Sequence, residues 1–245
     1  MINKQLLQSL ISKYYLNGLV ESVKWSVSNN TLNVKFMSPA QDMLGEVTLK
    51  NITLPDAEIA IFDATKLNKL LAITNQTLNL DFIYSRKVLT KLIINDGVYN
   101  LEYPLADLLV IPRVAAIKDP GYNIVADINE DVPFLVKAQN ALDTNHVYFN
   151  LERELSGEQI IEVNFGENNS HSNRISYKIK KIEETKDLPI MCSLLFDSTL
   201  LKEILKCNGN ATSSKMYIFT DGLMRLEFEE GDIKSTYFLV KKDDI

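Results

Sequence analysis

The sequence predicts an α+β protein made of two similar domains, each with two helices packed on antiparallel sheets. Two observations lead to this prediction. A pair of motifs recurs in the same order along the chain, and helical segments are each followed by several strand-like segments. The chain has 245 residues, which is enough for one large domain or for two domains of ordinary size.

The first recurring motif is Phe-Asp-small-Thr followed by an apolar helical stripe, at 62–71 and again at 196–205, an offset of 134 residues. The second is Asp-Gly-x-x-x-Leu-Glu-aromatic, within 95–103 and again within 220–228, an offset of 125 residues. This second match is longer than a hairpin turn requires. We therefore interpret the pattern as a duplication with nine fewer residues between the motifs of the second copy. The alternative is a coincidence of common helix and hairpin signals.

The boundary between the copies is predicted in the proline-rich stretch 104–133, because prolines interrupt regular structure. The apolar run at 108–111 indicates that this stretch packs on the domains that it joins. We expect a first domain at 1–110, a connector at 111–132 and a second domain at 133–245.

Helices are predicted at 4–15, 65–74, 134–142 and 199–207. In the clearest of them, Leu67, Leu70, Leu71 and Thr74 lie on one face, and Asp63 or Thr65 can cap its start. Hairpin turns are predicted at Asn29-Asn30, Asp96-Gly97 and Asp221-Gly222. The remaining β-rich segments are expected to be strands: 23–27, 32–36, 78–82, 88–94, 98–103, 147–151, 160–165, 175–179, 216–219, 223–228 and 235–240.

The distribution of charge is uneven. A net charge of −6 argues against a simple nucleic-acid coat. The helical windows 3–16, 64–74, 134–142 and 198–208, however, contain seven lysines and only one acidic residue, Glu203. The lysines are Lys4, Lys13, Lys66, Lys69, Lys137, Lys202 and Lys206. On one helix such lysines are usually a solvated face, but the same sign on four helices of an acidic chain favours a common basic surface.

A basic surface of this kind attracts phosphates without sequence preference. Salt screens charges beyond about 8 Å at physiological strength, so an acidic exterior farther away would repel a duplex only weakly. A protein that holds DNA loosely and slides along it needs this combination.

The motifs of the common enzyme classes are missing. His146 and His171 have no metal-ligand spacing, and no P-loop, GxGxxG or GxSxG occurs. Asp127, Glu130 and Asp131 form a small acidic cluster that could bind a divalent cation, although a solvated connector is the favoured interpretation. We expect no catalytic residues, no metal and no cofactor.

The cysteines, the absence of long apolar runs and the polar N-terminal segment indicate a cytoplasmic location. Cys192 and Cys207 lack CxxC spacing and are interpreted as reduced thiols. No run of about 18 apolar residues is present, and the N-terminus is too polar for a signal-peptide core. We expect a cytoplasmic protein, in a host cell if phage-encoded, with no membrane partner.

Two segments carry a family resemblance. Residues 61–73 resemble the second-helix motif of the sliding DNA clamps of T-even-type bacteriophages, and 215–242 look like the closing strands of such a clamp. The order of elements fits nearly the whole chain. These motifs are structural and not catalytic, and the family belongs to the same superfamily as proliferating cell nuclear antigen.

The resemblance implies a DNA-clamp fold assembled into a homotrimeric ring, with helices lining the hole and sheets forming the outer wall. It implies that an ATP-dependent clamp loader opens the ring and that the clamp tethers the DNA polymerase for processive synthesis. In phage relatives the clamp also assists late transcription. On this view the seven lysines named above face double-stranded DNA.

The resemblance also implies an apolar pocket for a partner peptide near the connector. The residues assigned to it are Val110, Ile111 and Pro112, with Leu239 and Val240 of the last strand as candidates. For each of these residues, ordinary core or connector packing is an equally good interpretation. The chain is expected to be longer than the phage prototype around 151–186, with an exposed loop at 166–173.

Three functions remain open at this point. The first is a sliding clamp, the second a duplicated α+β module that binds a protein partner without DNA, and the third an enzyme whose site is built from scattered residues. Ring assembly and retention on circular DNA separate the first from the second, and a turnover assay would be needed to support the third.

Overall fold

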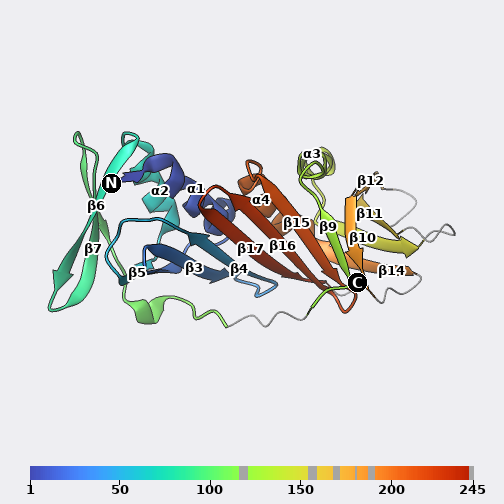
Figure 1. The fold of residues 1–245 in the computed structure, drawn as a ribbon, viewed down its shortest axis with the longest axis horizontal. Coiled ribbons are helices and arrows are strands. Elements are labelled where there is room, and N and C mark those ends of the chain that lie inside the picture. Colours follow the sequence, from blue (N-terminus) through green and yellow to red (C-terminus); the bar gives the residue numbers. More distant parts are fainter. Residues whose placement is uncertain (116–120, 154–158, 168–171, 180, 187–190, 243–245) are drawn as a thin grey trace. The chain divides into compact units, whose positions relative to one another are not determined.

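The computed structural model describes residues 1–115, 121–153, 159–167, 172–179, 181–186 and 191–242 (Figure 1). The chain divides into two compact units. The first comprises Met1–Ala116 with Asp232–Ser235, and the second comprises Ile117–Gly231 with Thr236–Ile245. This division falls inside the connector predicted at 111–132, and strand β9 (Ile124–Asp127) of that segment belongs to a sheet of the second unit.

The first unit contains helices α1 (Lys4–Tyr15) and α2 (Ala64–Ala72) and two short 3₁₀ turns, η1 (Leu16–Gly18) and η2 (Leu108–Val110). Its strands pair antiparallel in two sheets. One has the order β1 (Ile2–Asn3), β6 (Thr77–Ser85), β7 (Val88–Asn95) and β8 (Asn100–Pro104). The other has the order β5 (Ala57–Ile61), β2 (Val23–Ser28), β3 (Thr31–Met37) and β4 (Met43–Leu49).

The second unit contains helices α3 (Val132–Leu142) and α4 (Ser198–Cys207), also with antiparallel sheets. One sheet has the order β12 (Ile175–Lys178), β11 (Gln159–Phe165), β10 (His146–Arg153) and β14 (Met191–Asp197). The other has the order β13 (Lys181–Thr185), β9, β15 (Ser213–Phe219), β16 (Leu223–Glu230) and β17 (Ile233–Val240). The expected α+β class with helices packed on antiparallel sheets is therefore confirmed.

The Phe-Asp motif has one structural role in both copies. Asp63 caps α2 by accepting a hydrogen bond from the Lys66 backbone N–H at 2.7 Å. Asp197 caps α4 by accepting from the backbone N–H groups of Thr199 at 2.8 Å and Leu200 at 3.0 Å. Each carboxylate satisfies donors that the first helical turn leaves unpaired. This repeat therefore marks equivalent helix starts in the two units.

The second predicted repeat matches turns that are not equivalent. The Asp96-Gly97 turn joins β7 to β8, the second and third strands after α2, whereas Asp221-Gly222 joins β15 to β16, the first and second strands after α4. The counterpart of Gly97 in strand order is Gly231, between β16 and β17, and both glycines have positive φ. Gly97 and Gly231 are 134 residues apart, the same offset as the helix motif. The predicted shortening of the second copy between the motifs is therefore wrong.

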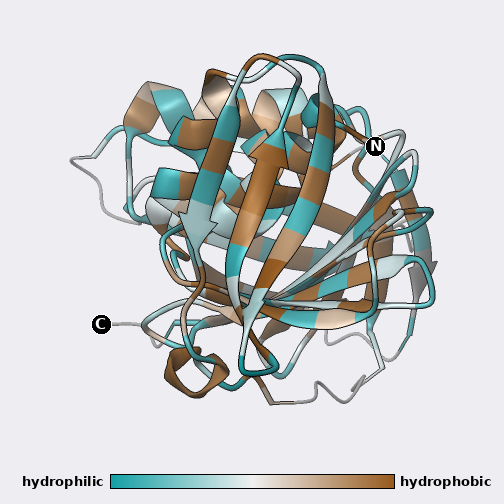
Figure 2. Cartoon of the chain, turned by 90° about the vertical axis from the view of Figure 1, so that its left-hand side faces the viewer, coloured by the Kyte–Doolittle hydropathy of each residue, from teal (hydrophilic) through white to brown (hydrophobic). Residues whose placement is uncertain are grey.

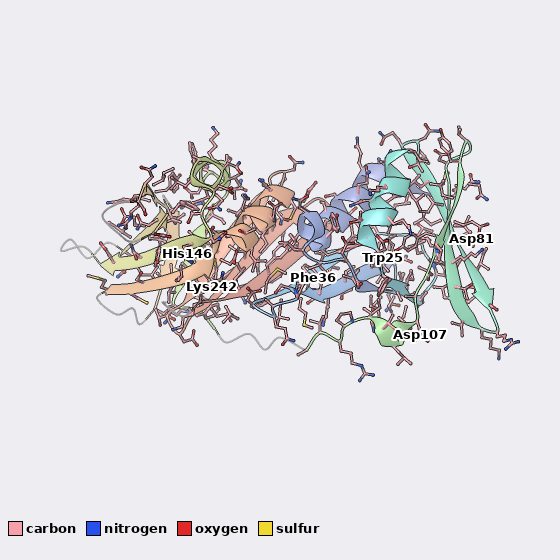
Figure 3. All side chains as sticks on the ribbon, turned by 180° about the vertical axis from the view of Figure 1, so that it is seen from behind. Trp25, Phe36, Asp81, Asp107, His146 and Lys242 are labelled. Carbon is pink, nitrogen blue, oxygen red and sulfur yellow. The ribbon has the colours of Figure 1, made fainter. Side chains whose placement is uncertain are left out.

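Each unit has its own apolar core, which the alternation of apolar and polar residues along the strands creates (Figure 2). In the first unit Trp25 of β2 and Phe36 of β3 are buried (both labelled in Figure 3), and the ring centroid of Phe36 lies 6.4 Å from that of the buried Tyr14 of α1. In the second unit Phe149 and Phe196 meet edge to face at 5.7 Å. Within the described residues, no helix has both the length and the apolar character that crossing a membrane requires.

Candidate functional site

The helices of each unit form a pair that carries the predicted basic residues. In the first unit α1 packs beside α2 and on β4, and in the second α3 packs beside α4 (Figure 1). The apolar stripe of each helix lies in the core: Leu67 and Leu71 of α2 and Leu201 and Ile204 of α4 are all buried. Packing of this stripe leaves the opposite helical face in contact with solvent.

Four of the predicted lysines have exposed positions on these helices. Lys66 and Lys69 lie on α2, Lys137 lies on α3 and Lys206 lies on α4. Lys66 is 3.9 Å from the carboxylate of Asp63, Lys206 is 3.6 Å from that of Glu203, and the ammonium of Lys137 lies 5.8 Å from the Phe134 ring centroid. These are loose contacts on the surface, so the four ammonium groups remain accessible to an anionic partner.

Three other predicted lysines are held by their own chain. Lys13 is only 1% exposed, so its prediction as a DNA-facing residue is wrong for this conformation. The ammonium of Lys4 donates to the backbone carbonyls of Ala72 at 3.0 Å and Thr74 at 2.5 Å, where it caps the end of α2. Lys202 has a side chain that is only 15% exposed and lies 3.6 Å from the Asp143 carboxylate.

The two helix pairs differ in their acidic neighbours. Neither α1 nor α2 contains an acidic residue, although Asp63 caps the start of α2 and Glu21 accepts hydrogen bonds from Thr65 there. In the second unit α4 contains Glu203, and the Asp143 side chain, directly after α3, is 88% exposed. The helices of the first unit therefore carry lysines without acidic residues of their own.

The connector turn η2 borders a hollow in the first unit with a volume of about 600 Å³. Of the predicted partner residues, Ile111 and Pro112 line this hollow, and Ile111 is mostly buried whereas Pro112 is exposed. Val110 is 56% exposed beside them. The floor of the hollow is polar and comes from β2, β3 and β5, through residues that sequence reasoning missed: Lys24, Ser26, Asn33, Lys35 and Glu58.

The two candidates on the last strand behave differently from each other. Leu239 is 1% exposed and belongs to the core of the second unit, so its prediction as a partner contact is wrong for this conformation. Val240 is 50% exposed. Strand alternation explains the difference, because neighbouring residues on a strand point to opposite faces.

The acidic residues near β9 do not form a metal site. Asp127 accepts a hydrogen bond from the Lys181 ammonium at 2.6 Å, and this bond lowers the pKa of the Asp127 carboxyl. Asp131 is buried and accepts from the Tyr177 hydroxyl at 2.6 Å. Among the described residues, no group of three His, Cys, Asp or Glu side chains could hold a metal ion. His146 lies on β10, and His171 lies outside the described residues.

The cysteines are free thiols within the described structure. Burial raises the pKa of the Cys192 thiol, which favours its protonated form. Most of the loop predicted at 166–173 lies outside the described residues.

Known proteins resemble this chain in structure and not in sequence. No protein-family model matches the chain, and no curated protein matches it by sequence. The structure of A. fulgidus PCNA bound to the C-terminal region of FEN-1 is similar with a TM-score of 0.76 and 16% identity, over 100% of this chain and 98% of that chain. PCNA from Thermococcus kodakaraensis is similar with a TM-score of 0.73 and 15% identity, over 99% of this chain and 98% of that chain.

A third similar structure, the proliferating cellular nuclear antigen of Entamoeba histolytica, has a TM-score of 0.73 and 13% identity, over 98% of this chain and 94% of that chain. These similarities extend over nearly the whole chain, although the sequences differ at most positions. The chain therefore has the fold of the PCNA-type sliding clamps.

Proposed function

We propose that this protein is a non-enzymatic sliding clamp subunit that encircles double-stranded DNA and tethers a DNA polymerase for processive synthesis. The observation that carries the proposal is the whole-chain similarity of its fold to three PCNA structures. The exposed lysines Lys66, Lys69, Lys137 and Lys206 support it, because they occur on helices of both units.

The small number of exposed lysines fits a ring that slides. Each lysine that contacts a phosphate strengthens binding in a salt-dependent and sequence-independent way. A protein with few such contacts per subunit would leave DNA quickly if it were open. A closed ring would stay on the duplex by topology, so weak contacts are sufficient and allow sliding.

Ring formation requires association between subunits, and we propose a homotrimer. Among the described residues, the four-stranded sheet of the first unit ends in β1 and β8 and that of the second unit ends in β12 and β14. Of these edges we propose β8 and β12 for the contact, because β1 has only two residues and β14 leads directly into α4. An edge strand presents unpaired N–H and C=O groups to another chain. Pairing β8 of one subunit with β12 of the next would be a head-to-tail contact, which closes into a ring when the rotation permits.

The partners follow from the same proposal. An ATP-dependent clamp loader would open the ring, since the chain has no nucleotide-binding motif of its own. The hollow beside η2, with Ile111 and Pro112, would receive a segment of the polymerase. The A. fulgidus structure, in which PCNA is bound to the C-terminal region of FEN-1, supports peptide binding as the mode of recruitment. A phage-type clamp that also assists late transcription is the most specific form of the proposal.

A duplicated α+β module that binds a protein partner without encircling DNA is the alternative. The hollow beside η2 favours it as much as it favours the clamp, because a peptide site needs no ring. The two functions differ in whether the topology of the DNA affects retention.

Retention on circular DNA tests the proposal. The protein is diluted to dissociate rings, mixed with a nicked circular plasmid and concentrated, so that rings close around DNA without a loader. Gel filtration then measures the protein that travels with the plasmid. We expect co-elution with the circle and loss after a restriction enzyme linearises it. Equal retention on circular and linear DNA, or none on either, would contradict the clamp.

A further inference from the structure

Two hollows of the first unit adjoin the turn η2 and share two residues. The first, described above, has a volume of about 600 Å³, and the second has about 440 Å³. Leu108 of the turn and Glu58 of β5 line both of them. Because both hollows meet at these residues, an extended chain segment can occupy the two in succession.

The first hollow has an excess of positive charge. Its charged lining residues are Lys24, Lys35, Arg113 and Glu58, and Lys24 pairs with Glu58 at 2.6 Å. Lys35 and Arg113 are exposed, and no carboxylate in the described part of the chain lies within ion-pair distance of either. Two cations are therefore available to an acidic ligand.

The second hollow has the opposite sign. Its charged lining residues are Asp56, Glu58, Asp107 and Lys87. Asp56 accepts a hydrogen bond from the Asn29 backbone N–H at 3.1 Å, and Asp107 accepts from that of Leu109 at 2.8 Å. Each of these bonds uses one carboxylate oxygen, so the negative charges remain accessible to a basic ligand.

The turn between the hollows is apolar and exposed. Leu109 is 82% exposed, Leu108 41% and Val110 56% (the brown coil at the lower left of Figure 2; Figure 3 labels Asp107 at its start). Three consecutive exposed aliphatic side chains are unfavourable in water, and covering them would release about 25 cal/mol for each Å² buried. The capping bond from Leu109 to Asp107 holds the turn in place before any partner arrives.

We propose that the two hollows form one docking track for an extended segment of a partner protein, with an acidic residue in the first hollow, apolar residues over η2 and a basic residue in the second. The track has a direction, because reversing the segment would place like charges together, and like-charge contacts oppose binding. This inference rests on the proposed function, in which the clamp recruits partners through short segments.

Peptide selection tests the track with the full-length protein. A phage-displayed library of random peptides about twelve residues long, which span about 40 Å when extended, is selected on the wild-type protein. The same library is selected on K35Q/R113Q, which neutralises the first hollow, and on D56N/D107N, which neutralises the second but keeps an acceptor oxygen at each position. Lys50→Gln, at an exposed lysine after β4, is the matched control.

We expect the wild type and K50Q to enrich peptides with an acidic residue, an apolar pair and a basic residue in one fixed order. K35Q/R113Q should lose the acidic preference and retain the basic one, and D56N/D107N should do the reverse. Fluorescence anisotropy with an enriched peptide should give about tenfold weaker binding to either double variant, because each loses the charges that a charge-assisted hydrogen bond to the peptide requires. Circular dichroism would verify that each variant is folded.

Enriched peptides without a charge order would overturn the track, and so would the same preference on both double variants. Plasmid retention is measured separately on the same proteins. Loss of the charge order with intact retention on circles removes only the track, whereas an ordered peptide preference without retention removes the clamp and leaves the docking site.

Discussion

The lysines of the helices differ in what surrounds them, and this difference determines how accessible each ammonium group is. Lys69 is exposed, and the structure records no interaction of its side chain within the described residues. Lys13 belongs to the same predicted set but is 1% exposed. The sequence predicted both lysines for the same surface, yet burial of a side chain depends on the neighbouring element, which periodicity along one helix does not reveal.

Neutralising Lys69 should weaken the direct contact with DNA, which is measured on linear DNA because topology holds the ring on a circle. In Lys69→Gln we expect the slope of log binding constant against log salt to fall by about one for each phosphate contact that is lost. Fluorescence anisotropy with a labelled linear duplex, measured between low and moderate salt, gives this slope. Lys50→Gln is the control, and an unchanged slope in Lys69→Gln would exclude this lysine from the DNA contact.

The Asp96 carboxylate should make the free energy of unfolding of the first unit decrease as the pH falls. It accepts backbone N–H bonds from Tyr99 at 2.6 Å, Asn75 at 2.6 Å and Val98 at 2.8 Å, and these bonds lower the pKa of its carboxyl below the ordinary value. A lowered pKa means that the contribution is present above the unfolded-state pKa and is lost as pH falls through the folded-state pKa.

Asp96→Asn tests this dependence. The amide keeps one acceptor oxygen but cannot accept from Asn75 with its nitrogen. We expect a lower urea midpoint than wild type at pH 7, and a difference that shrinks as the pH is lowered towards 3. A difference that is constant across this range would show that the charge of Asp96 does not matter.

At the scale of single elements, strand β4 requires a glycine at position 45, and the sequence of β4 alone does not explain why. Gly45 lies opposite Phe36 in the register of β3 and β4, and a Cβ at position 45 would lie 2.2 Å from the Phe36 ring. Both residues are buried. Glycine is therefore needed because the aromatic ring occupies the space over its Cα.

Gly45→Ala should destabilise the first unit by about 1–3 kcal/mol through overpacking. Phe36→Leu alone should also destabilise the protein, because it leaves part of the ring volume empty. The double variant should be more stable than the sum of the two changes predicts, since leucine relieves the clash. Urea unfolding of the four proteins measures this coupling, and strict additivity would argue against the contact.

Helices were easier to predict than strands for a physical reason. The segment 4–15 was predicted with the bounds that α1 has, because its apolar stripe is a local signal. Strands β1, β4, β5, β9, β13 and β14 were not predicted. In β4, Gly45 is an unfavourable strand residue that only the partner strand explains. The turn Arg86-Lys87 was missed similarly, since both residues have positive φ without being glycine.

The candidate surfaces were predictable to different degrees. The exposed lysines came from the helix pattern, which is local. The polar floor of the first hollow combines β2, β3 and β5, and its charged residues meet only because of strand pairing. A single sequence carries no signal for that pairing beyond the alternation of polar positions within each strand.

At the scale of the whole molecule, the duplication was inferred correctly from one motif and partly wrongly from the other. The helix motif is tied to a cap, which fixes its position, whereas an Asp-Gly turn serves any hairpin. After each unit's second helix the strand order repeats with the constant offset of 134 residues, from Gly97 to Gly231 as from Phe62 to Phe196. A constant offset means that neither copy gained or lost residues between these points.

Association between subunits is the property on which the clamp depends. Light scattering across a concentration range should give a particle of three times 27.8 kDa that dissociates slowly or only partly on dilution. A strict monomer at every concentration would contradict the ring and leave the peptide-binding module as the better explanation.

A charge swap tests whether β8 and β12 make the contact. Glu102 on β8 and Lys178 on β12 are exposed residues of opposite sign, although Glu102 also pairs with Lys91 at 2.6 Å. Opposite charges facing each other across paired strands stabilise the pairing, and like charges oppose it. Lys178→Glu should therefore raise the monomer fraction at a given concentration, and Glu102→Lys should do the same. The double variant, which restores opposite signs, should recover much of the trimer. If either single change leaves the mass distribution as in the wild type, the ring closes through other edges.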